Sequence, residues 1–335
     1  MKRGLLDVVA CPLDGAWPLA LEGARTRDRG AQFSPGDQDE VDEGFLRCLQ
    51  CGTVFPIVDG IPALLPPKEF YRESSQWADQ TSEQLKRDEQ AATHEERLSP
   101  CLTRLERALT LGALRPRRAE AVLEVGAGTG RLTAALAGRC REVVALDFSL
   151  RSLQLLRARV NQAADGRGES TRVHAVQADL CFLPLRANAF SKCLAGQVLQ
   201  HLPGEGARKR GLAHLARVLR PGAVMAVSVY NHGRAARGDG QARAPREGFH
   251  AEGAIYYYRF ERAELARLLE PSFSVQRMWG FYTPRIERLR SVGLALNRCL
   301  AATPLGFRWG QYLLAACTMV EDGRILKQAG GGGDA

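Results

Sequence analysis

The pattern of apolar and polar positions changes at about residue 120. Beyond it, short apolar runs alternate with segments that carry apolar residues at helical spacing. The apolar runs predict strands over 121–125, 143–147, 173–177, 192–195, 223–230, 275–281 and 313–320. The amphipathic segments predict helices over 131–139, 150–163, 206–219 and 262–269. This alternation indicates an α/β domain with a mostly parallel sheet covered by helices on both faces.

The first 68 residues have a different texture, with short strand candidates and many turn residues. Asp59-Gly60 is a hairpin signal, and Pro66-Pro67 marks the exit from this segment. Residues 69–115 form a charged, amphipathic stretch that predicts helix with a break near Ser99-Pro100. We therefore expect a small β-rich domain over 1–68, a helical connector or lid over 69–118, an α/β domain over 119–323 and a flexible tail over 324–335.

Two long insertions interrupt the α/β pattern, one over 231–258 and one over 282–312. Segments of this length in a compact domain usually serve as lids or binding elements. The first is rich in glycine and arginine and ends in Tyr256-Tyr257-Tyr258. The second is dense in apolar residues, which predicts an extra helix over the sheet, with a homodimer interface as the alternative.

Composition places the chain among ordinary globular proteins. It has 335 residues, of which 45% are hydrophobic and 25% charged, and this excludes a disordered chain, a collagen-like fibre and a coiled coil. No apolar stretch approaches the length of a membrane span, and Asp7 interrupts the N-terminal apolar run that a secretory signal would need. Nine cysteines, an odd number, are typical of reduced thiols. We expect a cytoplasmic protein without a membrane partner.

The net charge of +9 is unevenly distributed along the chain. Residues 1–68 hold 7 basic and 10 acidic residues, whereas residues 116–280 hold 25 basic and 14 acidic ones. A basic surface attracts nucleic acid or an anionic small molecule. Charge alone does not choose between these partners.

The strongest local motif is a glycine-rich turn after the strand predicted at 121–125. Gly126, Gly128 and Gly130 open the next helix, so that a ligand can approach the main chain closely. A dinucleotide fingerprint would need a small residue where this chain has Arg131. Glu124 places a carboxylate at the mouth of the turn, which suits a cationic ligand better than a pyrophosphate. Asp147 ends the next strand, where a carboxylate can accept hydrogen bonds from ribose hydroxyls.

Four segments in order resemble the motifs of class I S-adenosylmethionine (SAM) dependent methyltransferases. They are Glu-Val-Gly-Ala-Gly-Thr-Gly at 124–130, Val-Ala-Leu-Asp-Phe-Ser at 144–149, Gln-Ala-Asp-Leu at 177–180 and Arg-Val-Leu-Arg-Pro-Gly-Ala at 217–223. A single glycine loop would be weak evidence, but four linked motifs are specific. The resemblance covers about 121–320. It implies a doubly wound, seven-stranded, Rossmann-like sheet with SAM as cofactor.

The resemblance also implies which residues bind the cofactor. They are Glu124, Gly126, Ala127, Gly128, Gly130, Asp147, Phe148, Asp179, Leu180 and Gln197. Asp147 matches the acid that binds the ribose and Asp179 the acid that faces the adenine amino group. Gln197 matches a position that faces the methionine moiety. The alternative is an ordinary glycine turn with surface acids.

Three residues are candidates for a general base: His201, Tyr230 and His232. His201 resembles a position that often serves packing, because a lone histidine needs a partner to act as a base. Tyr230 and His232 follow a strand at its carboxyl end, where ligand clefts of α/β sheets open. The run Tyr256–Tyr258 fits either an aromatic substrate pocket or packing at a sheet edge.

The small N-terminal domain contains a cysteine pattern with metal-ligand spacing. Cys48-x-x-Cys51 resembles half of a zinc site, and Cys11-x-x-Asp14 the other half with one thiolate replaced. Together with Phe55-Pro-Ile-Val-Asp-Gly-Ile-Pro62, the segment resembles the zinc-ribbon-like domain that activates RNA and protein methyltransferases or is fused to a methyltransferase. Cys11, Asp14, Cys48 and Cys51 are therefore the candidate zinc ligands, and a metal-free core of buried thiols is the alternative.

These observations leave three functions open. The first is methyl transfer from SAM to a small-molecule acceptor, in a biosynthetic role, by in-line displacement. The second is RNA methylation, which the basic α/β domain favours and the acidic N-terminal domain disfavours. The third is a SAM-binding scaffold without catalysis.

Overall fold

The computed structural model describes residues 1–26, 40–67, 69, 80–93, 98–164, 171–233, 245–250, 255–289 and 292–320. The chain divides into two compact units. Unit 1 comprises Met1–Leu98, Pro116–Ala189 and Phe249–Ile255, and unit 2 comprises Ser99–Arg115, Phe190–Gly248 and Tyr256–Ala335. The tail predicted over 324–335 lies outside the described residues, as do parts of the connector and of the first insertion.

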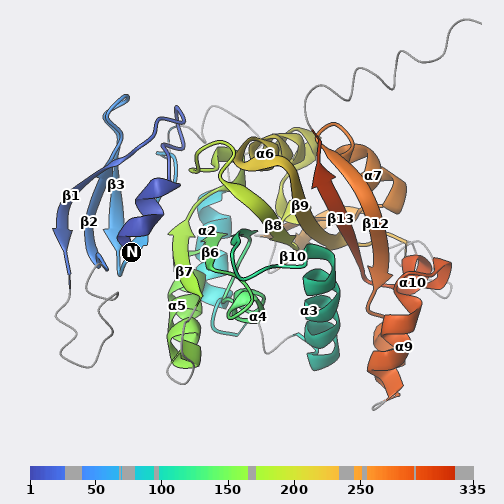
Figure 1. Cartoon of the computed structure of the whole chain (residues 1–335). Coiled ribbons are helices and arrows are strands. Elements are labelled where there is room, and N and C mark those ends of the chain that lie inside the picture. Colours follow the sequence, from blue (N-terminus) through green and yellow to red (C-terminus); the bar gives the residue numbers. More distant parts are fainter. Residues whose placement is uncertain are drawn as a thin grey trace, which may run out of the picture. The chain divides into compact units, whose positions relative to one another are not determined.

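A seven-stranded sheet in the order β12-β13-β9-β8-β5-β6-β7 forms the core of the α/β domain (Figure 1). β5, β6 and β7 are parallel to one another, and β8 is parallel to β9. β13 runs antiparallel to both β9 and β12. The bounds are β5 Ala121–Val125, β6 Glu142–Asp147, β7 Arg172–Gln177, β8 Phe190–Gly196, β9 Leu219–Tyr230, β12 Phe273–Phe281 and β13 Tyr312–Met319. The predicted fold class and all seven predicted strands are confirmed.

Helices follow the strands as the amphipathic pattern predicted, with two shifted boundaries. They are α4 Thr133–Leu136, α5 Leu150–Ala164, α6 Gly204–Val218 and α7 Arg262–Leu269. The prediction of a helix over 131–139 was too long, because Gly138 has a φ of 75° and the chain leaves the helix at Ala137. The helix predicted to reach residue 219 ends at Val218, since Leu219 already pairs with Phe190 in the sheet.

The N-terminal segment forms a four-stranded antiparallel sheet in the order β1-β2-β3-β4. After a short 3₁₀-helix, η1 Arg3–Asp7, the strands are β1 Ala20–Arg25, β2 Glu43–Arg47, β3 Val54–Val58 and β4 Ile61–Pro62. Asp59 and Gly60 both have positive φ, 50° and 70°, and this confirms the predicted hairpin between β3 and β4.

Within unit 1 this small sheet is joined to the edge strand β7 by main-chain hydrogen bonds. Leu64 N donates to Gln177 O at 2.9 Å, directly after a parallel bridge between Ala63 and Gln177. A second junction follows β7, where Ala10 N donates to Pro184 O at 2.9 Å. The N-terminal domain therefore extends the β7 edge of the strands that carry the glycine loop.

The connector contains two helices, as the break at Ser99-Pro100 predicted. α2 spans Gln80–Gln90 in unit 1 and α3 spans Pro100–Leu114 in unit 2. Ser99 caps α3, because its hydroxyl accepts hydrogen bonds from Cys101 N and Leu102 N.

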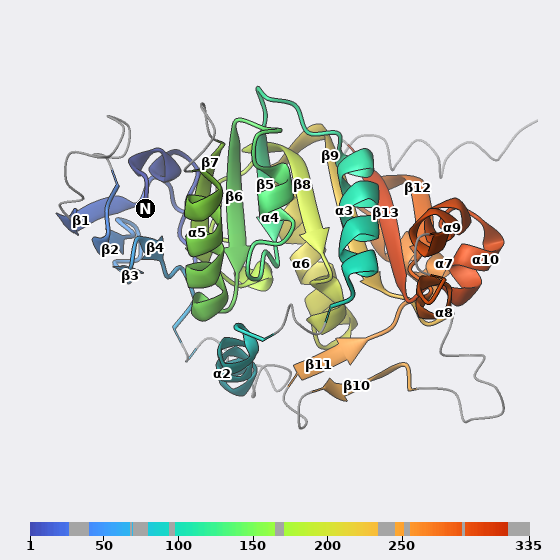
Figure 2. The same ribbon diagram turned by 90° about the horizontal axis from the view of Figure 1, so that it is seen from below.

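The described parts of the two insertions have regular structure. The first contains a two-stranded sheet, β10 Glu247–His250 and β11 Ile255–Tyr258. The second contains three short helices, α8 Pro284–Glu287, α9 Gly293–Leu300 and α10 Pro304–Trp309, and α9 and α10 pack beside β12 (Figure 2). The predicted extra helical cover is thus present. Among the described residues, no helix has the length and apolar character needed to cross a membrane.

Candidate functional site

The glycine loop of unit 1 is shaped by positive backbone φ angles. Gly126, Gly128 and Gly130 have φ values of 70°, 54° and 85°, which residues with a side chain rarely adopt. Ala127 N donates to Leu146 O at 2.9 Å, so the loop is joined to the end of β6. A Cβ built on Gly128 meets no atom within 4 Å, whereas one on Gly130 lies 2.8 Å from Leu156 Cγ. Gly130 is therefore required by packing on α5, and Gly128 borders open space.

Asp147 ends β6 and is held by two main-chain donors. Its Oδ2 accepts from Gly128 N at 2.8 Å, and its Oδ1 accepts from Ser149 N at 2.9 Å. Burial raises the pKa of Asp147, while these two hydrogen bonds and the nearby Arg87 guanidinium act in the opposite direction. A carboxylate has about four acceptor positions, so two remain for further donors such as ribose hydroxyls.

Glu124 is a buried carboxylate beneath the glycine loop. Its exposed fraction is 2%, and its Oε2 accepts a hydrogen bond from Thr133 Oγ1 at 2.7 Å. Burial raises the pKa of Glu124 to about 7, against the lowering effects of Thr133 and Arg131. A cationic ligand group beside this carboxylate would favour its ionised form.

The segment after β7 holds the residues that the resemblance assigns to adenine. Asp179 caps the 3₁₀-helix η4 Leu180–Phe182, because its Oδ1 accepts from Cys181 N at 2.8 Å. Gln177 Nε2 donates to Phe148 O at 3.0 Å, which connects β7 to the residue after Asp147. Asp179 and Leu180 are both buried. Phe148 and Asp179 are thus fixed by the same β6–β7 edge that the N-terminal domain extends.

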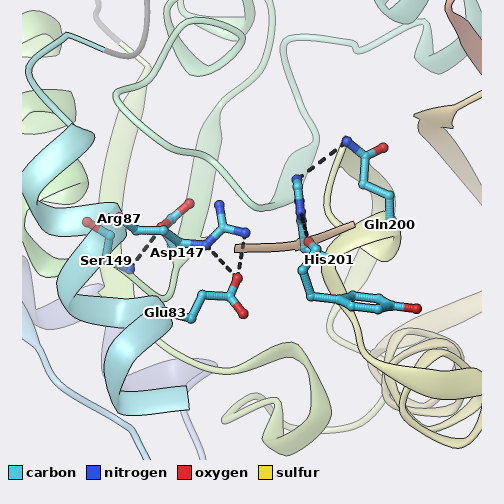
Figure 3. A network of polar contacts seen from close by, with 7 residues as sticks. Glu83, Arg87, Asp147, Ser149, Gln200 and His201 are labelled. Atoms are coloured by element: carbon cyan, nitrogen blue, oxygen red, sulfur yellow. Dashed lines mark hydrogen bonds and ion pairs between the residues drawn. The ribbon is translucent and has the colours of Figure 1, made fainter. Parts of the chain in front are cut away.

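α2 attaches the connector to the start of α5, directly after Asp147 and Phe148. Asp88 Oδ1 accepts hydrogen bonds from Ser149 Oγ and from Arg151 N at the start of α5. Arg87 is paired with Glu83 one turn earlier, at 2.6 Å, and Figure 3 shows this pair beside Asp147. The sequence did not reveal this attachment. The sequence showed only that Asp88 is an acidic residue in a segment predicted to be a helical connector or lid.

Gln197 follows β8 in unit 2 and adopts an unusual backbone conformation. Its φ is 56°, and its main-chain N donates to Ser228 O at 2.9 Å. The side-chain Nε2 donates to Glu106 Oε1 at 2.8 Å, and Ser228 Oγ donates to the same oxygen at 3.2 Å. Glu106 is completely buried on α3. The connector therefore supplies the acceptor that orients Gln197.

His201 lies at the end of the 3₁₀-helix η5 Leu199–His201 with a defined tautomer. Its Nδ1 is 2.7 Å from Tyr256 O, and because a carbonyl can only accept, Nδ1 carries the proton. The Gln200 amide donates to Nε2 at 3.4 Å, as the dashed line in Figure 3 shows. Nε2 is thus the basic nitrogen of the neutral ring.

An aromatic cluster that includes Tyr230 lies against His201 in unit 2. Tyr230 makes edge contacts with His201 at 5.9 Å and with Tyr257 at 6.4 Å between ring centroids. Tyr257 and Tyr258 are buried, and Tyr258 stacks on the Arg208 guanidinium at 4.1 Å. Tyr257 and Tyr258 thus pack in the interior, Tyr256 is half-buried with its hydroxyl donating to Glu247, and Tyr230 is in contact with His201.

His232 is positioned by the main chain after β9. Its N donates to Phe260 O at 2.9 Å, and the preceding Asn231 is fixed by side-chain hydrogen bonds to Phe307 O and Gly310 O, both at 2.8 Å. Of the three base candidates, His201 and Tyr230 are in mutual contact, and the main chain of His232 is held by Phe260.

The four candidate zinc ligands meet in the N-terminal domain. The donor atoms of Cys11, Asp14, Cys48 and Cys51 all lie within 4.8 Å of one another. Cys11 Sγ is 3.7 Å from Cys51 Sγ, and Cys48 Sγ is 3.4 Å from Asp14 Oδ2. Tetrahedral zinc, with bonds of about 2.3 Å to sulfur and 2.1 Å to oxygen, separates its ligands by roughly 3.6–3.8 Å. This donor set fits zinc.

Comparisons with known proteins define the class. Residues 122–222 match the family model described as "Methyltransferase domain", and residues 2–60 match the one described as "Trm112p-like protein". The glycine loop and Asp147 lie within the first match. The chain thus carries a methyltransferase domain, with the ordered motifs of SAM-dependent methyltransferases, behind a Trm112p-like domain.

Two curated relatives and one solved structure resemble parts of this chain. Demethylmenaquinone methyltransferase of Clavibacter sepedonicus is 36% identical over 118 residues, 35% of this chain and 44% of that protein. The enzyme of the same name from Renibacterium salmoninarum is 30% identical over 135 residues, 40% of this chain and 52% of that protein. The chain therefore spans about half the length of these relatives. Among solved structures, the [4+2]-cyclase SpnF has the same fold, with a TM-score of 0.50 and 19% identity over 74% of this chain and 96% of its own.

Proposed function

We propose that the protein transfers a methyl group from SAM to a small, ring-containing acceptor molecule. The observation that carries SAM binding is the Asp147 carboxylate, which the glycine loop and Ser149 hold by main-chain hydrogen bonds with acceptor positions left over. The ring-containing acceptor rests on the names of the two relatives. The open space beside Gly128 and the buried carboxylate of Glu124 suit a ligand that combines a ribose with a cationic amino acid end.

SAM would supply an electrophilic methyl group on a sulfonium sulfur. In the proposed arrangement Asp147 binds the ribose hydroxyls, Asp179 and Phe148 bind the adenine, and Glu124, Ala127 and Gln197 face the methionine end. Glu106 keeps the Gln197 amide oriented through its 2.8 Å hydrogen bond. These residues bind and orient the cofactor, which is the main contribution that an enzyme makes to an in-line displacement.

His201 is the proposed general base. Its Nδ1 proton is committed to Tyr256 O, so its Nε2 is the nitrogen that would accept a proton, in place of the weak 3.4 Å hydrogen bond from Gln200. That proton would come from an O–H or N–H acceptor as its atom takes the methyl group or, for a ring carbon, from the C–H that is lost after the carbon has taken the methyl group. Tyr230, in edge contact with His201, would line the acceptor side. The names of the two relatives make a quinol-type ring the first acceptor to test.

The test is methyl transfer from radiolabelled SAM to a panel of acceptors. We expect transfer to a quinol-type small molecule and none to transfer RNA or ribosomal RNA. Replacement of His201 by Asn, which preserves a donor toward Tyr256 O, should lower kcat about 100-fold and flatten its pH profile while SAM binding persists. Transfer only to RNA would favour the RNA alternative, and SAM binding without any transfer would favour a scaffold.

For the N-terminal domain we propose a structural zinc ion held by Cys11, Asp14, Cys48 and Cys51. Metal analysis should find one zinc per chain, and Cys48→Ser should lower both zinc content and thermal stability. Cys299→Ser, which changes an exposed thiol outside the cluster, is the matched control. Purified wild-type protein that is folded and free of zinc would contradict this proposal.

A further inference from the structure

The second insertion presents an unusual surface on α9, α10 and the segment that precedes them. Of the exposed residues in the described parts of 284–310, not one is acidic. Five are large apolar residues with exposed fractions of 41–52%, namely Leu289, Val292, Leu296, Leu305 and Trp309. Four are arginines, namely Arg285, Arg288, Arg298 and Arg308. These nine residues are called the α9–α10 face below.

α9 exposes a stripe of apolar residues, which a helix that only covers a sheet does not need, although Leu294 and Leu300 are half-buried. Val292, Leu296 and Cys299 follow one another at helical spacing and are exposed, whereas Asn297 is buried. Asn297 is satisfied there, because it accepts from Thr283 N at 2.6 Å and donates to Gly293 O at 3.0 Å. These hydrogen bonds of Asn297 fix the orientation of α9, and in this orientation the apolar stripe is exposed.

The α9–α10 face is held rigidly against β12. Gly280 N donates to Ala301 O at 2.9 Å, and a Cβ added to Gly306 would lie 2.6 Å from Gly280 O. Thr303 caps α10 through its hydroxyl, which accepts from Gly306 N at 3.3 Å. Such close backbone contact keeps the exposed leucines and Trp309 in one fixed arrangement.

The charge of this surface limits what can bind it. The nearest acid in sequence, Glu287, is occupied by the hydroxyls of Ser99 and Tyr282. A second copy of the chain in a twofold interface would bring arginines against arginines, which is repulsive. RNA would engage the arginines but would leave the leucines in contact with phosphate.

We propose that the α9–α10 face docks on the surface of an anionic lipid bilayer. Arginines attract anionic headgroups, while aliphatic side chains and Trp309 enter the interface between headgroups and acyl chains. The sequence alone predicted no membrane partner because it has no spanning segment, but peripheral docking needs none. This proposal is independent of methyl transfer, since it concerns only the surface of unit 2.

Flotation of the full-length protein with lipid vesicles tests the proposal. We expect binding to phosphatidylcholine vesicles that contain phosphatidylglycerol, weaker binding to pure phosphatidylcholine, and loss of binding at high salt. The double variant Arg298→Glu/Arg308→Glu should lower the partition coefficient about 30-fold or more, since each arginine near an anionic surface contributes about a factor of five. The matched control is Arg118→Glu/Arg267→Glu, which makes the same change in charge at exposed positions elsewhere.

A second pair of variants tests the apolar contribution. Leu296→Gln/Leu305→Gln should lower the partition coefficient about tenfold, whereas Leu49→Gln/Leu85→Gln, also exposed, should leave it unchanged. No flotation of wild-type protein with anionic vesicles at low salt would overturn the proposal. So would equal losses in the control variants, or wild-type self-association that the α9–α10 variants abolish. RNA binding that depends on the arginines and not on the leucines, without flotation, would also overturn it.

Discussion

Two regions of this molecule are built in different ways: the candidate cofactor residues of unit 1, and the candidate site residues of unit 2. The second group joins Gln197, which is itself a cofactor candidate, to the acceptor-side candidates His201 and Tyr230, and is called the acceptor region below. In unit 1, the glycine loop, Asp147 and Ser149 lie close together in sequence, and main-chain hydrogen bonds position them. In unit 2, Gln197 depends on Glu106 and His201 on the carbonyl of Tyr256, 91 and 55 residues away in sequence.

The two regions differ in which amino-acid substitutions are expected to alter them. A site positioned by the backbone depends on a few glycines and one carboxylate, so its function changes through single substitutions of those residues. A site assembled from side chains on separate segments can be altered by changes in the connector or the insertions. Loops and insertions are where related proteins differ most in sequence, so the side-chain contacts of unit 2 are the more variable of the two kinds.

The largest expected effect is that of Asp147→Ala on cofactor binding. The change removes the proposed acceptor for two ribose hydroxyls, each worth about 1.5–3 kcal/mol with a charged partner, so S-adenosylhomocysteine should bind at least about 100-fold more weakly. Calorimetric titration measures this, with circular dichroism to verify the fold. Tyr230→Phe, in the acceptor region, should change this affinity less than about twofold. An equal loss in Tyr230→Phe would mean that the two regions are not separable.

The second largest effect is a loss of stability on replacement of Glu106, the residue of the connector that accepts hydrogen bonds from Gln197 and Ser228. Glu106→Ala leaves the buried donors Gln197 Nε2 and Ser228 Oγ without their shared acceptor, and should lower the free energy of unfolding by about 2–4 kcal/mol. Glu106→Gln keeps an acceptor oxygen and should retain most of that stability. Urea denaturation of both variants checks this. Similar stability of Glu106→Ala and wild type would show that Gln197 is oriented by other groups.

The cofactor region was largely predictable from sequence because its determinants are local. The strand, the three positive-φ glycines and the acid at the end of the next strand follow each other in one motif, and parallel strands bring their carboxyl ends to one edge. Cys11, Asp14, Cys48 and Cys51 could likewise be grouped by spacing, and their donor atoms do meet.

The acceptor region could not be predicted to the same degree, since its contacts are between distant segments. Glu106 was visible only as a charged residue on the buried stripe of α3, beside Leu102 and Leu105. The partner of His201 is a main-chain carbonyl, which no residue type reveals. The exposed apolar stripe of α9 depends on how the helix is attached to β12, where Gly280 N donates to Ala301 O directly after α9, a contact that no residue type reveals.

A smaller effect is expected for Glu124→Gln, and it depends on pH. Because burial raises the folded-state pKa of Glu124 from 4.5 to about 7, the folded protein binds more protons than the unfolded one between these values. The contribution of Glu124 to stability therefore falls as pH rises from about 4.5 to 7 and stays low above. Glu124→Gln should gain about 1–3 kcal/mol relative to wild type at pH 8 compared with pH 4. Chemical denaturation at both pH values measures this difference, and a pH-independent difference would contradict the raised pKa.

The smallest effect is expected for Asp88→Ala, which tests whether the connector also supports the cofactor region. Asp88 accepts from Ser149 Oγ and Arg151 N, as a cap does at the start of a helix, so its loss should cost about 1 kcal/mol. Glu89→Ala, which removes only an exposed pair with Lys86, is the control. Hydrogen exchange should then be faster in α2 and at the start of α5, with S-adenosylhomocysteine binding weakened severalfold because Ser149 also holds Asp147. If exchange changes while binding does not, α2 is an attachment of the connector alone, and the cofactor region depends only on its own backbone.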